Sequence, residues 1–248
     1  MEFTLTEAQQ DLSGLTRSVV TELVTNDRLR ELDAAEDRFD AILWNALASA
    51  GVLGAALPES VGGDGFGVLE QCSILAELGR GVAAVPFLTS IVGSAAAIAE
   101  FGSDQQRDEW ASAAAAGEKI LTAALAEEYN DDPAHPVTRA EKTADGWRID
   151  GAKITVDSAP LADLFLVPAI TEDGVAVFLV EPPTRACASP GNRPRISRVR
   201  PWSSSIRCRF RPIVFSGRLP KDPTSRHGSS KEFSSVPAPT STGCSIRH

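Results

Sequence analysis

The sequence predicts an α+β fold: an N-terminal all-α helical domain (1–118), a partial antiparallel β-domain (119–183) and a disordered basic tail (184–248). Apolar residues recur at spacings of three and four up to about residue 117, which is typical of helices, and then at a spacing of two, which is typical of strands. Composition and charge then change abruptly at residue 184. These two changes define the three parts.

The helical part begins at Thr6, a residue type that caps helix N-termini. The apolar face of the first helix consists of Leu12, Leu15, Val19 and Leu23. A second helix ends near residue 50, and Gly51 suits the position just past a helix end. Its apolar stripe consists of Ile42, Leu43, Ala46, Leu47 and Ala50. Two helices are therefore expected before the Gly-rich loop at 57–67.

Three further helices are predicted after that loop. One runs over 68–78 and stops at Gly79, and the next begins near Pro86 and ends at Phe101. Ser103 and Gln106 form the pattern of a capping box, which predicts the start of a helix that runs to residue 117.

Strands are predicted where the apolar period becomes two, with a tight turn at Asp145-Gly146. The expected strands are 120–125, 137–142, 147–150, 151–156, 164–167 and 175–180. Neighbours along the chain are expected to pair as an antiparallel meander. No continuation is visible after Pro182-Pro183, so the last strand is expected to keep an unpaired edge.

The last 65 residues differ sharply from the body. Residues 1–183 hold 11 of the 24 basic and 31 of the 33 acidic residues, a net charge of −20, whereas 184–248 has a net charge of +11. The tail contains one leucine, too few aliphatic side chains to offset its ordering entropy. Two interpretations stay open: a basic arm that binds nucleic acid or an acidic partner, or a sequence that is not the evolved continuation, such as frameshifted translation. The break in mid-sheet favours the second, and no nucleic-acid-binding motif is visible.

Composition narrows the function classes. The acidic body disfavours contact with phosphate backbones and anionic membranes. No apolar run approaches the roughly 20 residues that a membrane helix needs, and Met1 is not followed by a signal-like segment. Cys72 is the one cysteine of the body, which favours a reducing cytoplasm. Spacing alone predicts no metal site, since the adjacent carboxylates Asp131 and Asp132 are typical of a solvated loop.

Four motifs in order carry a family resemblance. They are 57–63 (LPESVGG), 75–80 (LAELGR), 125–128 (LAEE), and 151–153 (GAK) followed by 160–163 (PLAD). On these element types they resemble the acyl-CoA dehydrogenase family over residues 1–183, covering the N-terminal helical domain and about half of the middle β-domain. Residues 84–88 (AVPFL) suit the shorter dehydrogenases of bacterial steroid and branched-chain degradation. In some of those, two unlike subunits assemble.

The resemblance implies FAD-dependent α,β-desaturation of an acyl-CoA thioester, in which a carboxylate takes the α-proton. It implies flavin contacts at Leu125, Ala126, Thr155, Val156 and Asp157, and a substrate contact at Asp132. The family's catalytic carboxylate comes from a C-terminal bundle that would begin after residue 183. No catalytic residue is therefore assigned, and neither Glu127 nor Glu128 is given that role.

Three departures from the family pattern affect the flavin site. Ala126 stands where the family has a threonine, Thr155 where it has a flavin-packing tryptophan, and Asp157 where it has a hydroxyl residue. A carboxylate beside a reduced flavin is unfavourable because like charges repel. Backbone donors at Ala126 and Val156 are expected to remain.

Three functional hypotheses follow. The first is an acyl-CoA dehydrogenase subunit, truncated or frameshifted and with little activity alone. The second is a non-redox partner subunit of a hetero-oligomeric dehydrogenase. The third is a binding module with a basic nucleic-acid arm.

Overall fold

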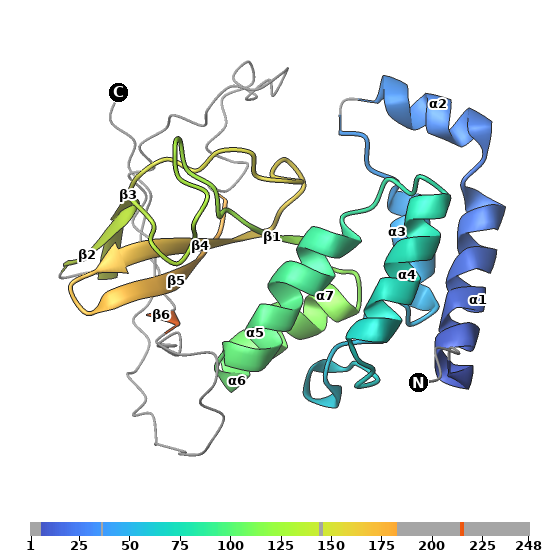
Figure 1. Cartoon of the computed structure of the whole chain (residues 1–248), viewed down its shortest axis with the longest axis horizontal. Coiled ribbons are helices and arrows are strands. Elements are labelled where there is room, and N and C mark those ends of the chain that lie inside the picture. Colours follow the sequence, from blue (N-terminus) through green and yellow to red (C-terminus); the bar gives the residue numbers. More distant parts are fainter. Residues whose placement is uncertain (1–5, 36, 144–145, 183–213, 216–248) are drawn as a thin grey trace, which may run out of the picture.

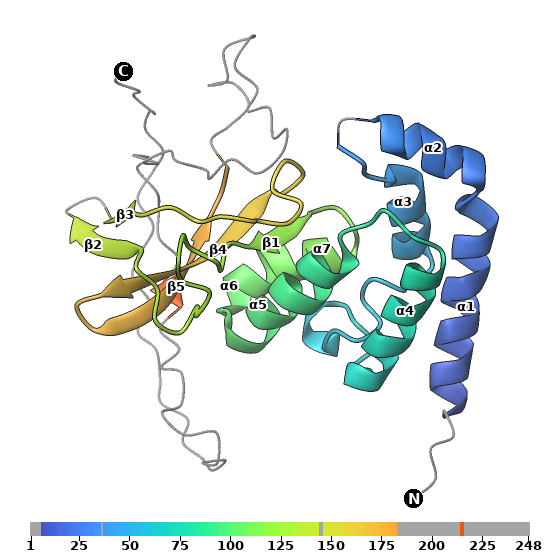
Figure 2. The same cartoon turned by 45° about the horizontal axis from the view of Figure 1, so that its top comes forward.

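The computed structural model describes residues 6–35, 37–143, 146–182 and 214–215. The helices gather on one side of the molecule and a twisted sheet lies on the other (Figures 1 and 2). This arrangement confirms the predicted α+β class. The expectation of a disordered tail falls on residues outside the described part, apart from Val214–Phe215.

The helices occupy most of residues 7–115. They are α1 (Glu7–Leu23), α2 (Asn26–Ala34), α3 (Ala41–Ser49), the 3₁₀ turn η1 (Glu59–Val61), α4 (Val68–Arg80), the π-helical η2 (Phe87–Ala95), α5 (Ala96–Phe101), α6 (Asp104–Gln106), the π-helical η3 (Arg107–Ser112) and α7 (Ala113–Ala115). Each π-helical segment continues directly into the α-helix that follows it.

Local signals explain several helix ends. The Thr6 hydroxyl accepts from the Gln9 N–H while the Gln9 side chain accepts from the Thr6 N–H, which completes a capping box. Ser103 and Gln106 make the same pair before α6, as predicted. Gly51 has φ 73°, a backbone conformation that favours glycine, and so ends α3 as expected.

Helix α2 was not foreseen, because Leu32 is its one buried residue and no apolar stripe marks it. The predicted face of α1 is partly wrong. Leu15 is 43% exposed, whereas Thr16 is buried and donates its hydroxyl to the Leu12 carbonyl at 2.8 Å.

The sheet contains β1 (Leu121–Ala123), β2 (Arg139–Thr143), β3 (Gly146–Asp150), β4 (Leu164–Thr171), β5 (Gly174–Val180) and β6 (Val214–Phe215). The strand order is β3-β2-β4-β5-β6, and β1 also pairs with β4. The pairs β2–β3, β4–β5 and β5–β6 are antiparallel.

Three expectations for the sheet are corrected. The sheet is mixed, because β1 and β2 each run parallel to β4 after long returns of the chain. Residues 151–156 form no strand, since Thr155 has φ 48°, which no strand tolerates. The edge of β5 is not left open, because Val177 pairs with Phe215 of β6.

One apolar core joins the two parts of the molecule. Leu43, Leu47 and Ile74 from the helices belong to the same buried cluster as Leu121 and Leu164 from the sheet. A second cluster lies within the β-domain, where the Trp147 and Phe178 rings meet edge to face at 5.4 Å. The shared core fixes β1 and β4 against the helices. Of the helices in the described ranges, none combines the length and hydropathy needed to cross a membrane.

Candidate functional site

The segment that follows β1 lies beside the irregular segment that precedes β4. The Ile154 N–H donates to the Ala126 carbonyl at 2.9 Å, and the Thr122 hydroxyl donates to the Asp157 carbonyl at 2.7 Å. These bonds bring together two stretches that are far apart in the sequence. The predicted flavin contacts that share this place are Leu125, Ala126, Thr155, Val156 and Asp157.

Each segment carries a backbone N–H group that has no acceptor among the described residues. No described residue accepts a hydrogen bond from the N–H groups of Ala126 or Val156, and both residues are half-buried. Leu125 adds an apolar side chain that is 46% exposed. The combination of free N–H groups and apolar surface suits the edge and face of a flat, acceptor-rich ring.

A buried carboxylate lies directly after Ala126. The Oε1 atom of Glu127 accepts from the Lys153 ammonium at 2.9 Å and from the N–H (2.8 Å) and hydroxyl (2.5 Å) of Thr138. Its Oε2 atom accepts from the Val137 N–H at 2.5 Å and from Asn130 Nδ2 at 3.1 Å. One carboxylate thus holds the post-β1 loop, the start of β2 and the segment before β4.

Electrostatics keep this cluster charged. Burial raises the pKa of Glu127, but hydrogen bonds from Thr138, Val137 and Lys153 outweigh it and hold that pKa at about 2. Burial lowers the pKa of Lys153, and the Glu127 carboxylate opposes that shift. A carboxylate so fully engaged at neutral pH is poorly suited to abstract a proton.

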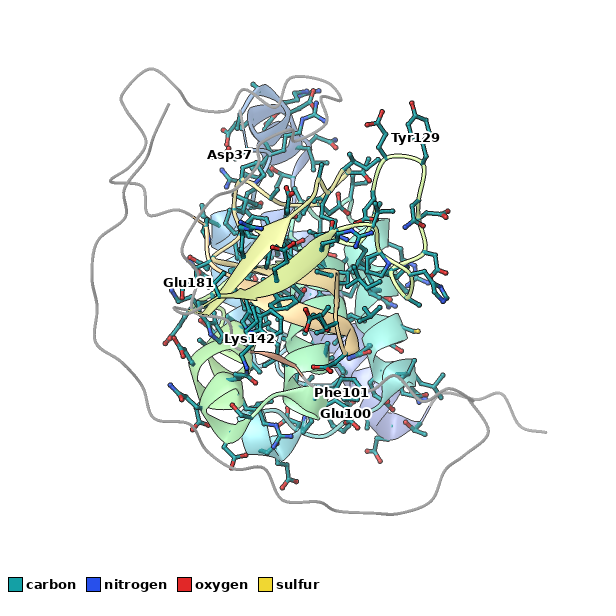
Figure 3. The ribbon with its side chains drawn as sticks, turned by 90° about the vertical axis from the view of Figure 1, so that its left-hand side faces the viewer. Asp37, Glu100, Phe101, Tyr129, Lys142 and Glu181 are labelled. Atoms are coloured by element: carbon teal, nitrogen blue, oxygen red, sulfur yellow. The ribbon has the colours of Figure 1, made fainter. Side chains whose placement is uncertain are left out.

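Asp132, the predicted substrate contact, lies in the loop after Glu127. Its carboxylate accepts from the Ala134 N–H at 2.9 Å and pairs with His135 Nδ1 at 2.7 Å, and the His135 bond lowers the Asp132 pKa. Its hydrogen bonds with described residues all stay within this loop. Tyr129, at the loop tip, is 98% exposed and points away from the sheet (Figure 3).

A cleft of about 320 Å³ opens between the helical part and the β-domain. Residues from 37–39, 83–86 and 158–161 line it. Ser158, on its wall, directly follows Asp157, so the cleft adjoins the candidate flavin segments. Arg38 and Ser158 both have positive φ, a strained conformation for residues other than glycine.

Comparison with known proteins shows which family the chain is similar to. Residues 6–118 match the family model described as "Acyl-CoA dehydrogenase, N-terminal domain". FadE27, an acyl-CoA dehydrogenase of Mycobacterium tuberculosis, is 49% identical over 180 residues, which are 73% of this chain and 47% of FadE27. The chain contains an acyl-CoA dehydrogenase N-terminal domain. It spans about half the length of the relatives that it matches.

Solved structures of related proteins share the fold of this chain. The ChsE4-ChsE5 complex of M. tuberculosis gives a TM-score of 0.69 at 48% identity, covering 73% of this chain and 49% of that one. The Tcur3481-Tcur3483 steroid ACAD gives 0.67 at 43%, covering 72% and 49%. A glutaryl-CoA dehydrogenase of Mycobacterium smegmatis, solved in complex with FADH2, gives 0.64 at 27%, covering 71% and 46%.

Two residues of the candidate site had no structural role in the sequence-based prediction. Glu127 and Lys153 lie in two of the motifs that carry the resemblance, but a sequence does not reveal that their charges meet in the interior. The signal that could have found them is an isolated lysine beside apolar residues 154 and 156.

Proposed function

We propose that this chain is a subunit of a flavin-dependent acyl-CoA dehydrogenase that acts in the cytoplasm with a homologous partner subunit on a steroid-type acyl-CoA. The single observation that carries the proposal is the pairing of the Ala126 and Ile154 segments, on which no described residue accepts a hydrogen bond from the N–H groups of Ala126 and Val156. The FADH2 complex of a relative supports the cofactor. The steroid ACAD and the ChsE4-ChsE5 complex support the substrate class and the partner.

Bound FAD would supply the acceptor for the β-hydride of the acyl chain. In this proposal the N–H groups of Ala126 and Val156 would donate to the ring system, and the Leu125 side chain would cover apolar ring surface. Thr155 and Asp157 would border the same ring. The free donors and the apolar patch fit the group, whereas the carboxylate of Asp157 works against a reduced, electron-rich ring.

The buried carboxylates of the described part are poor candidates for the base that takes the α-proton. Three carboxylates buried in the described part are Asp40, Glu77 and Glu127, and hydrogen-bond donors lower the pKa of each despite their burial. A base that takes an α-proton needs a pKa near the working pH. The proposal therefore takes the catalytic carboxylate from outside these residues, and we expect little activity from the chain alone.

A second candidate function is a non-redox partner subunit that shapes the pocket of a catalytic one. Three departures from the family pattern favour this role. The family's hydroxyl donor is replaced by Ala126, its aromatic wall by Thr155 and its neutral group by Asp157. Nucleic-acid binding is not proposed, since it would rest on 184–248, almost all of which lies outside the described residues.

The test is the visible absorption spectrum and dye-linked oxidation of a steroid-type acyl-CoA. The chain would be purified alone and together with a full-length homologous dehydrogenase subunit. We expect the assembly to carry more flavin than the partner alone and to oxidise substrate, while the isolated chain is slow. Unchanged flavin content on assembly would favour the non-redox role. Rates typical of a complete enzyme from the chain alone would contradict the assignment of the base.

A further inference from the structure

We propose that Lys153 and Glu127 are positioning residues that hold the two flavin-contact segments in register, a role that rests on the function proposed above. The pair is buried, with Lys153 6% and Glu127 5% exposed. It lies beside the proposed flavin contacts and is not itself one of them.

The contacts of Lys153 bracket Ala126. Its Nζ atom donates to the Leu125 carbonyl at 3.4 Å and to Glu127 Oε1 at 2.9 Å. The next residue, Ile154, donates its N–H to the Ala126 carbonyl at 2.9 Å. Three consecutive residues after β1 are therefore held by two consecutive residues before β4, and Ala126 lies at the centre.

No regular strand pairing could replace these contacts. Residues 151–156 form no strand, so the segments lack the repeated hydrogen bonds of a sheet ladder. The Glu127–Lys153 pair also reaches Thr138 at the start of β2, whose N–H and hydroxyl both donate to Glu127. The ion pair thus ties the two loop segments to the start of β2 in the sheet, which is how a binding site is held in a set shape.

Gly151 explains how Lys153 reaches this position. A Cβ atom at Gly151 would lie 2.4 Å from Thr138 Oγ1 and 2.8 Å from Thr138 Cα, and Gly151 has φ 157°. Only a residue without a side chain lets this segment lie so close to Thr138. Gly151 and Lys153 of the GAK motif therefore serve one purpose: the glycine permits the close approach, and the lysine then meets Glu127.

The test compares the full chain with two variants, Lys153→Met and the double variant Lys153→Met/Glu127→Gln. The single variant leaves a buried anion without its cation and is expected to lose folding stability. The double variant removes both charges and leaves no buried charge unpaired, so it can be measured even if the single variant does not fold. Arg17→Met is the matched control, because it removes a cation from another buried carboxylate, Glu77, in the helical domain.

Two readouts are measured: FAD affinity by fluorescence titration, and hydrogen exchange of the Ile154 amide in the absence of FAD. We expect the double variant to bind FAD about tenfold more weakly and to exchange this amide about tenfold faster, the size of losing one hydrogen bond to a charged group. Arg17→Met should change neither, although it lowers the melting temperature.

The proposal is overturned if the double variant folds, binds FAD with the affinity of the parental chain and exchanges the Ile154 amide at the parental rate. Equal effects from Arg17→Met would also overturn it, because the Lys153–Glu127 pair would then act only through the overall stability of the fold. If neither the parental chain nor its assembly with a homologous dehydrogenase subunit binds FAD through this chain, the proposed function fails. The exchange of Ile154 then still decides whether the pair holds the two segments together.

Discussion

Arg17 and Glu77 join α1 to α4 through two parallel hydrogen bonds, from Nε at 3.0 Å and from Nη2 at 2.8 Å to the two carboxylate oxygens. Ser13 donates a further bond at 3.0 Å, and Arg80 pairs with the same carboxylate. The Glu77 side chain is 3% exposed. A buried anion held by donors from both helices makes this helix contact dependent on the ionisation of one group.

The first prediction concerns acid stability. The hydrogen bonds from Arg17 lower the pKa of Glu77 to about 2 against its burial, so the folded state binds this proton less readily than the unfolded state does. Its contribution is therefore complete above the ordinary glutamate pKa of about 4.5 and is lost as the pH falls towards 2. We expect Glu77→Gln to lower the free energy of unfolding by roughly 1–3 kcal/mol at pH 7 and by much less at pH 3.

Urea unfolding at the two pH values measures this difference. Glu22→Gln, an exposed carboxylate on α1, is the control and should leave stability within about 0.5 kcal/mol of the parent. If Glu77→Gln lowers the free energy of unfolding equally at pH 7 and pH 3, the shape of the Glu77 side chain, and not its charge, explains its role.

The second prediction concerns the 57–63 motif. A Cβ atom at Gly63 would lie 2.1 Å from the Leu57 carbonyl oxygen and 2.5 Å from that of Gly54, and neither backbone atom can yield cheaply. We expect Gly63→Ala to cost at least about 2 kcal/mol, because the loop between α3 and α4 must rearrange. Thermal unfolding followed by circular dichroism measures the loss.

Gly14→Ala gives the matched comparison. Gly14 lies within α1, and nothing lies within 4 Å of a Cβ built there. Alanine is the better helix former, so this change should stabilise by about 0.5–1 kcal/mol. Equal changes in stability from Gly63→Ala and Gly14→Ala would show that backbone crowding does not explain the glycine at position 63.

Features set by neighbouring residues were predictable from the sequence. The capping boxes at Thr6 and Ser103 form from residues three apart, and the helices that follow begin where expected. Helix α2 was missed because it buries only Leu32 and five of its nine residues are charged, so its apolar pattern is too weak to detect. The parallel pairing of β1 with β4 was missed because it depends on where a long return of the chain ends.

The candidate site was also predictable from the sequence only in part. The motifs located both of its segments, because the LAEE and GAK residues lie on them. The alternating apolar residues Ile154 and Val156 resembled a strand, but Thr155 adopts φ 48° and Lys153 turns inward to Glu127. Which charges meet in an interior depends on tertiary packing, so the ion pair beside the flavin-contact segments could not be predicted from spacing.

The last prediction tests the flavin contacts themselves. The backbone carbonyl of Asp157 accepts from the Thr122 hydroxyl at 2.7 Å, whereas its side chain makes no hydrogen bond with a described residue. Asp157→Ser should therefore keep the backbone in place and remove only the charge. Two unit charges a few ångströms apart near a protein surface interact by a few kcal/mol at most, and solvent reduces this further. We expect FAD to bind about three- to tenfold more tightly and its reduction potential to rise, since the reduced ring is the more electron-rich form.

Asp150→Ser is the control for that change, because it removes an exposed carboxylate at the end of β3 and outside the two flavin-contact segments. Affinity is measured by titration and the potential by reductive titration against a dye of known potential. If both variants leave both quantities at the parental values, Asp157 does not border the flavin. The placement of Thr155 and Asp157 at the family's flavin positions is then wrong, and the flavin contacts on this segment must be assigned to other residues.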